Sequence, residues 1–161
     1  MVVNVLDAVL VVAMVTGGLI AGVFFVFTCA ITPALRRVDD ETYVTTFRAI
    51  NTAIVNGAFL AVFSAAPLSA LTAAVLGVWL QRSSPSWWLW SGATCSVLTL
   101  VITTVANVPL NRGLDQAPVA TGAQRRAARR RFETRWNRWN LARTVTSTAT
   151  LACLAVAAVP G

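Results

Sequence analysis

The sequence contains no histidine and no lysine, and only six acidic residues among its 161. Without histidine, a haem or transition-metal site would lack its commonest protein ligand. Charged residues make up 12% of the chain, whereas soluble domains have about 25%. Such a low charge cannot cover the surface of a soluble protein, and 57% of the residues are hydrophobic. We therefore predict an integral membrane protein that forms a single domain.

Cysteine is also sparse, and its pattern excludes two kinds of site. Cys29, Cys95 and Cys153 each stand inside an apolar segment, and none belongs to a Cys-x-x-Cys motif. An odd number of widely spaced cysteines argues against a disulfide framework and against a zinc site. We interpret them as small buried side chains. The segment before Ala8 lacks the basic residues of a signal peptide, so we predict that the first apolar run is retained.

All 13 basic residues are arginines, and the net charge is +7. A basic chain can indicate nucleic-acid binding, but phosphate-binding Gly-rich loops and aromatic-studded strands are missing here. The arginines instead flank apolar segments, as the positive-inside rule describes for membrane proteins. We predict the lipid bilayer as a partner, with anionic lipid near the arginines, and no nucleic acid.

Four apolar segments are long enough to span a hydrocarbon core, which takes about 20 helical residues. They cover residues 8–32, 51–80, 87–108 and 140–158. The predicted fold is therefore all-α, a four-helix transmembrane bundle with helices 2 and 4 extended on the cytoplasmic side. The two connections at that end carry nearly all the arginines, so we predict a multi-pass protein of the plasma membrane with both termini outside.

The second helix is predicted to be unusually long. Tyr43, Phe47 and Ile54 recur at helical spacing and lead directly into the second apolar segment. We predict one continuous helix from about Asp40 to Leu80, roughly 60 Å long at 1.5 Å per residue. Proline kinks helices, so a kink is expected at Pro67. The acidic residues 39–41 are placed to cap and charge the start of this helix.

Other breaks are predicted from proline, glycine and polar clusters. Pro33-Ala34-Leu35 should end the first helix and Pro109 should break the third, because proline lacks an N–H and disfavours helix before it. Residues 81–86 form a predicted polar hairpin. Residues 113–122 form a predicted flexible linker, with Thr121 capping the last helix.

Gly18 and Gly22 form a small-xxx-small pair in the first span. Such a pair lets another helix approach closely. Packing inside the bundle and formation of a homo-oligomer both agree with this pattern.

The last helix carries a polar face into the membrane. A 3.6-residue repeat places five of its side chains on that face: Glu133, Trp136, Asn140, Arg143 and Ser147. Polar side chains are costly in lipid, so those of Asn140 and Arg143 should face protein or a water-filled cavity.

Three further amides, Asn51, Asn107 and Asn111, fall at the cytoplasmic ends of other predicted helices. A shared depth favours one polar pocket just under the inner leaflet. The alternative treats each residue separately: Arg143 extends to the interface, the tryptophans anchor the helix, and the asparagines bond between helices.

Two motifs in the second half of the chain resemble the anthrone oxygenase-like family of small membrane proteins. They are Asn107-Val-Pro-Leu-Asn111 and Phe132-Glu133-x-x-Trp136-x-x-Trp139-Asn140-x-x-Arg143-Thr144. The family's named activity comes from fungal members that oxidise an anthrone to an anthraquinone with dioxygen, without a metal or flavin. The resemblance therefore implies a monooxygenase, an oxidoreductase that needs no cofactor and acts on a lipophilic aromatic small molecule.

The residues fit roles in that chemistry. An anthrone is a flat carbon acid whose anion reacts with dioxygen, so the protein must stabilise that anion. Arg143 and Asn140 are the predicted catalytic residues. The predicted substrate contacts are Trp136, Trp139, Asn107, Asn111 and Asn51. Base candidates are Glu133, Asp39, Asp40 and Tyr43, with water or a substrate phenolate as alternatives. The alternative function is a noncatalytic membrane scaffold or lipophile-binding protein.

Overall fold

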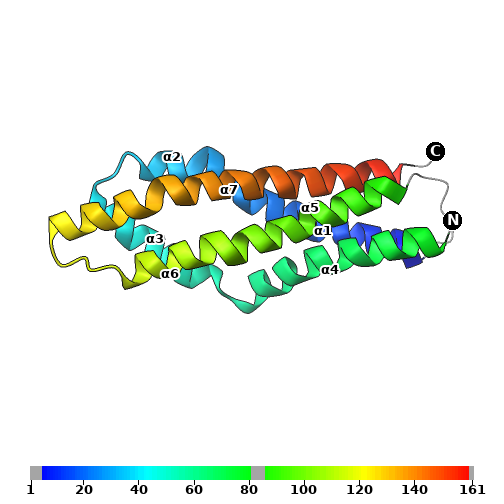
Figure 1. Cartoon of the computed structure of the whole chain (residues 1–161), viewed down its shortest axis with the longest axis horizontal. Helices are drawn as coiled ribbons and strands as arrows, with labels where there is room; N and C mark the ends of the chain where they lie inside the picture. The colour runs from blue at the N-terminus through cyan, green and yellow to red at the C-terminus, as the bar shows by residue number, and fades with distance from the viewer. Residues whose placement is uncertain (1–4, 81–85, 160–161) are drawn as a thin grey trace.

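A computed structural model describes residues 5–80 and 86–159, and it confirms an all-α helical bundle (Figure 1). In chain order the helical segments are α1 (Val5–Val26), the π-helical turn η1 (Phe27–Ile31), α2 (Thr32–Leu35), α3 (Asp40–Ile54), α4 (Gly57–Trp79), α5 (Ser86–Ile102), the π-helical turn η2 (Thr103–Asn107), α6 (Val108–Gln116) and α7 (Gly122–Ala158). Four helical stretches in the described chain are long and apolar enough to cross a membrane. The predicted hairpin over residues 81–86 falls almost wholly outside the described residues.

The four long helices α1, α4, α5 and α7 form a ring. Both α1 and α5 pack against α4 and against α7, so α1 and α5 lie diagonally opposite each other. Both termini lie at the same end of this bundle (Figure 1). Close packing there depends on small residues: a Cβ added at Gly92 would lie 3.0 Å from Leu154 Cδ2.

The predicted glycine pair is only partly used within the bundle. A Cβ added at Gly18 would meet Leu151 Cδ2 at 3.8 Å, which is ordinary contact with α7. Gly22 is exposed, and nothing lies within 4 Å of a Cβ added there. The homo-oligomer stays a prediction.

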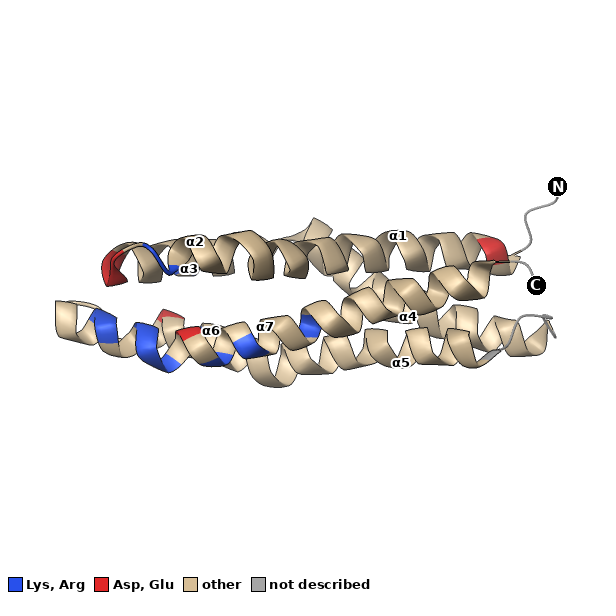
Figure 2. Ribbon diagram, turned by 90° about the horizontal axis from the view of Figure 1, so that it is seen from above, with Lys and Arg blue, Asp and Glu red and all other residues tan. Residues whose placement is uncertain are grey.

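The end of the bundle away from the termini carries nearly all the charged residues (Figure 2). Here α3 packs against α6 and against the first half of α7. The core of this end is aromatic: the Phe47 ring centroid lies 4.7 Å from that of Phe132 and 4.9 Å from that of Trp136. Tyr43 and Phe27 extend the same buried cluster.

The predicted single helix from Asp40 to Leu80 is wrong, because the chain leaves the helical conformation at Val55 and Asn56. The Asn56 side chain serves both flanking helices. Its Oδ1 accepts a hydrogen bond from Phe59 N at 2.9 Å, capping α4, and its Nδ2 donates to Ala53 O at 2.9 Å in α3. Asparagine competes with backbone groups in this way and favours a helix start.

Proline acts differently from the prediction at Pro109, which does not break its helix: it follows the π-helical turn η2, and helix continues to Gln116. The first helical stretch ends at Leu35, within the predicted Pro33-Ala34-Leu35 segment, and Pro33 likewise follows a π-helical turn. The wider turn offers a way to accommodate the missing N–H and the ring of proline. The linker is therefore shorter than predicted and covers residues 117–121. Pro67 lies inside α4, and the kink expected there stays a prediction.

Side-chain hydrogen bonds fix the helix ends at the charged end of the bundle. The predicted cap at Thr121 is confirmed, and Gln124 completes a reciprocal capping box. Arg129 Nη2 of α7 donates to Leu35 O at 3.3 Å, at the end of α2. Arg48 Nη2 of α3 donates to Leu114 O at 2.8 Å, near the end of α6. A cation at a helix C-terminus is favourable, so each arginine ties a short helix to another part of the chain.

Candidate functional site

The Arg143 side chain points into the bundle and is only 6% exposed. Its Cζ lies 4.2 Å from the Phe24 ring centroid and 5.3 Å from that of Trp136, which is cation–π geometry. Its Nη2 donates a hydrogen bond to Asn140 Oδ1 at 2.9 Å. The alternative in which Arg143 extends to the membrane surface does not fit this position.

Asn140 connects this arginine to the first helix. Its Nδ2 donates to Phe24 O at 3.1 Å and to Thr28 Oγ1 at 2.8 Å. The hydroxyls of Thr28 and Thr144 are also hydrogen-bonded, at 2.9 Å. Both the nitrogen and the oxygen of the Asn140 amide are therefore hydrogen-bonded, the nitrogen to α1 and η1 and the oxygen to Arg143. In this way Asn140 positions the guanidinium.

Arg143 has no carboxylate partner among the residues that the structure describes. Its Nε is buried and also lacks a hydrogen-bond partner there. Glu133 instead pairs with Arg129 at 2.9 Å, and it stands roughly 15 Å from Arg143 along the helix axis at 1.5 Å per residue. A buried cation without a counter-ion is costly. The position therefore favours binding of an anion from outside the chain.

The other base candidates lie farther away. Asp40 pairs with Arg129 at 3.2 Å, and Arg129 Cζ lies 4.4 Å from the Tyr43 ring centroid. Arg129 precedes Arg143 by roughly 21 Å along α7 at 1.5 Å per residue. Burial raises the pKa of Tyr43, so this phenol keeps its proton at neutral pH. A hydrogen bond from a backbone N–H of the first turn of α3 lowers the pKa of Asp39, which caps that helix.

Asn107 is the second notable buried group. It ends η2, its side chain is 1% exposed, and neither Oδ1 nor Nδ2 has a partner among the described residues. Thr99 bonds Thr146 at 2.7 Å on one side of it, and Asn111 bonds Trp136 at 2.8 Å on the other. Asn107 therefore lies alongside the part of α7 that carries the buried guanidinium. Buried polar groups without partners are rare, and each is a candidate to bind water or a ligand.

Trp136 is held in place by its indole nitrogen, which donates the bond to Asn111 Oδ1. Its ring packs on Phe47 and Phe27 and turns toward Arg143. Thus the structure brings Arg143, Asn140 and Trp136 together, with Asn111 joined through the indole.

Two predicted substrate contacts lie apart from this network. Asn51 Nδ2 donates to Asp115 Oδ1 at 3.5 Å, where α3 meets α6. Trp139 is 43% exposed and lines an outer groove between α6 and α7.

Three residues of this region were not predicted from the sequence. Phe24 and Thr28 bind the network from the first span, and their spacing of four residues was the available signal. Asn137 follows Trp136 in the same motif, and both of its amide atoms are buried without a partner in the described part of the chain.

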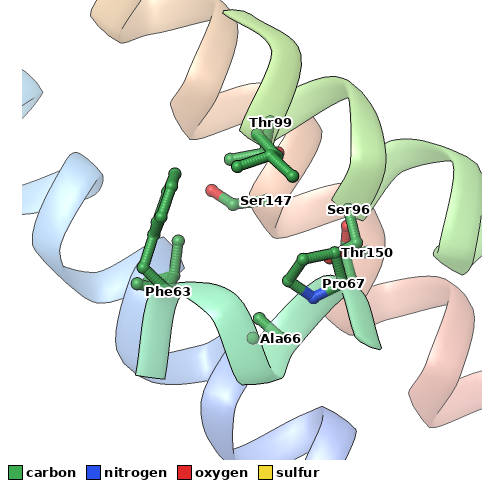
Figure 3. A pocket seen from close by; sticks show the side chains of 10 residues that line it. Phe63, Ala66, Pro67, Ser96, Thr99, Ser147 and Thr150 are labelled. Carbon is green, nitrogen blue, oxygen red and sulfur yellow. The ribbon is translucent and has the colours of Figure 1, made fainter. Parts of the chain in front are cut away.

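A small cavity lies one turn beyond Arg143 at the centre of the bundle (Figure 3). Its volume is about 10 Å³, enough for about one water molecule. Hydroxyls from two helices face it: Ser96 and Thr99 of α5, and Ser147 and Thr150 of α7. Phe63 of α4 closes the opposite side. A three-ring aromatic molecule does not fit here without movement of a helix.

The first half of α4 is less buried in the bundle than its second half. All the buried residues of α4 lie at or after Ala66, so the segment from Gly57 to Ala65 contributes none. Leu60 in that segment is an exposed large hydrophobic side chain. Weakly buried segments open at low free-energy cost.

The three cysteines are free thiols, and the prediction that they are buried is wrong: Cys29 is exposed on the bundle, and Cys95 and Cys153 are partly exposed. Across residues 5–80 and 86–159, no three side chains of the histidine, cysteine, aspartate or glutamate type come together to hold a metal ion.

Together these features define the class: a helical bundle of membrane type with a guanidinium enclosed in its interior by amides and aromatic rings. The chain belongs to the anthrone oxygenase family, whose model matches residues 46–153. This match confirms the resemblance drawn from the motifs. Searches of curated proteins and of solved structures each found no match.

Proposed function

We propose that this protein is a membrane-embedded oxygenase that oxidises an anthrone-like aromatic molecule with dioxygen. The observation that carries the proposal is the buried Arg143 guanidinium, which has no carboxylate partner among the described residues. Membership of the anthrone oxygenase family supports the substrate class. We further infer that the arginine-rich end faces the cytoplasm, because positive charge concentrates there (Figure 2).

The reaction is balanced without an external reductant. The substrate loses a proton from its methylene carbon, and the charge spreads onto its carbonyl oxygen. The carbanion then forms a C–O bond with dioxygen, which takes up the electrons, and protonation gives a hydroperoxide. Loss of water breaks the O–O bond and leaves a second carbonyl at that carbon. The sum is anthrone plus dioxygen giving anthraquinone plus water.

The role of Arg143 in this reaction is electrostatic. Its guanidinium would pair with the oxygen that carries the negative charge after deprotonation, in an interior that strengthens such contacts. Removing a single preorganised donor of this kind typically slows a reaction about 100- to 1,000-fold. Asn140 holds the guanidinium through its bond at 2.9 Å, and Trp136 offers an adjacent aromatic face.

The unpartnered amide of Asn107 would bind a carbonyl or phenolic oxygen of the substrate. Asn111 would act indirectly by holding Trp136. We leave Asn51 and Trp139 outside this proposal, because Asn51 bonds Asp115 and Trp139 is exposed.

The substrate proton would go to water or to the substrate's own phenolate, since the acidic candidates lie roughly 15 Å or more along α7 from Arg143. The small cavity one turn beyond Arg143 must enlarge before an aromatic molecule enters. We infer that the first half of α4 moves aside to admit the substrate from the membrane.

The test uses purified protein in lipid nanodiscs, with an anthrone and dissolved oxygen. Anthraquinone formation is followed by absorbance and compared with autoxidation in empty nanodiscs. Wild-type protein should exceed the blank, and Arg143→Ala should fall to the blank rate. Arg138→Ala is the matched control, because Arg138 is exposed on the same helix and should leave the rate unchanged.

Equal rates for wild-type protein and blank would refute the oxygenase proposal for that substrate. A bound lipophile found by mass spectrometry without turnover would instead support the noncatalytic binding protein.

A further inference from the structure

An outer groove runs between α6 and α7, on the charged half of the molecule, with a volume of about 690 Å³. Apolar side chains from η2, α6 and α7 line most of it. They include Val105, Pro109, Leu110, Phe132 and Trp139. Two arginines, Arg131 and Arg135, complete the lining on the α7 side.

The α7 side of the groove has an ordered polarity. Arg131, Arg135 and Trp139 follow at intervals of four residues, which places them on one helix face. Along this face the side chains change from guanidinium to indole in the direction of the apolar spans. Val105, 69% exposed, lies on the opposite wall. This sequence of charged, aromatic and apolar groups matches the polarity of a phospholipid at a membrane boundary.

The positive charge of the groove is not neutralised within the described chain. Other arginines of α7 are paired: Arg125 with Glu41 at 3.1 Å, and Arg129 with Glu133 at 2.9 Å. No ion pair joins Arg131 or Arg135 to a described residue, and the other polar side chains in the lining are those of two glutamines.

We propose that this groove binds the headgroup of an anionic phospholipid. The phosphate would lie between Arg131 and Arg135, where guanidinium groups provide charge-assisted hydrogen bonds. One acyl chain would pass Trp139 and Val105 toward the apolar spans. Basic pockets at membrane boundaries bind lipid headgroups in this way. This inference goes beyond the oxygenase proposal and does not depend on it.

Native mass spectrometry of the full chain in detergent tests the proposal, with phosphatidylglycerol titrated against phosphatidylcholine. The wild type should retain phosphatidylglycerol in preference. The double variant Arg131→Gln/Arg135→Gln should bind it about 30-fold more weakly, since each basic residue near an anionic headgroup contributes about a factor of five. The matched control is Arg130→Gln/Arg138→Gln, which removes the same charge from exposed positions outside the groove and should bind as the wild type does.

A third variant changes the shape of the groove without changing charge. Ala127 is exposed on the groove wall, and Ala127→Trp should fill the site and displace the lipid. Circular dichroism checks that each variant keeps its helix content. Equal weakening in both arginine variants would overturn the proposal in favour of diffuse charge attraction. Unchanged binding in Arg131→Gln/Arg135→Gln or in Ala127→Trp would overturn it as well.

Discussion

Replacing Asn107 with leucine should stabilise the protein and impair its activity. The side chain is 1% exposed, and neither amide atom has a partner among the described residues. Burying an unpaired amide costs about 1–3 kcal/mol in protein mutational data. Leucine has a similar size and no polar group, so Asn107→Leu should raise the free energy of unfolding by about 1–2 kcal/mol. Anthrone oxidation should fall, because the donor and acceptor proposed for the substrate are lost.

Asn140→Leu is the contrasting change. The Asn140 amide makes three hydrogen bonds, to Phe24 O, Thr28 Oγ1 and Arg143 Nη2, at 3.1, 2.8 and 2.9 Å. Side-chain hydrogen bonds between membrane helices average about 0.6 kcal/mol each. Leaving a buried group unsatisfied adds about 1–3 kcal/mol. The loss of stability should therefore be about 3–5 kcal/mol, opposite in sign to that of Asn107→Leu.

Unfolding free energies can be measured by steric trapping in bicelles, alongside the nanodisc oxidation assay. An Asn107→Leu variant as destabilised as Asn140→Leu would contradict this prediction, because the Asn107 amide would then be bonded in the native state. Full activity of Asn107→Leu would contradict it as well, since the amide would then have no part in binding the substrate.

Three further changes test single features in the same assays. Trp136→Phe keeps an aromatic ring but loses the bond to Asn111, so stability should drop by about 1 kcal/mol and oxidation should slow; unchanged values would remove the positioning role. At Gly92 even an added Cβ would lie 3.0 Å from Leu154 Cδ2, so the larger side chain of Gly92→Val should cost about 1–3 kcal/mol of stability through overpacking. Unchanged stability would show that α7 shifts freely. Hydrogen bonds in the first turn of α3 hold the pKa of Asp39 below its ordinary 3.8. Its stabilising effect is therefore present above that pH and is lost as the pH falls further, and Asp39→Asn should flatten this part of the stability–pH profile.

The bundle was predictable because its signals are local and repeated. From Gly122 to Ala158 the chain has no internal proline or glycine, and α7 runs unbroken over 37 residues. The break at Asn56 was missed because the apolar helical pattern continues on both sides of it. Hydrophobic periodicity indicates which face of a helix is buried, but it does not indicate where one helix ends and the next is capped. The Asn56-Gly57 pair was the available turn signal.

The core of the site was predictable for a related reason. Trp136, Asn140 and Arg143 stand at helical spacing, so any helix brings them to one face. Their partners in α1 were not predictable, because the face of α1 that meets α7 is decided by packing of distant segments. Trp139 shows the same limit: it is adjacent to Asn140 in sequence, yet it points to the outer groove.

The first and second halves of the chain each contain a π-helical turn followed by a proline. The two turns differ in whether their polar side chains already have hydrogen-bond partners. In each half a long apolar helix passes into a π-helical turn, and Pro33 or Pro109 follows at the second residue after that turn. Such turns often occur at functional sites. The first turn supplies Thr28, which is already bonded to the amide that holds Arg143. The second supplies Asn107, which has no partner in the described chain. We therefore infer that a substrate bound to Arg143 lies on the η2 side of α7, where the hydrogen-bonding capacity is unused.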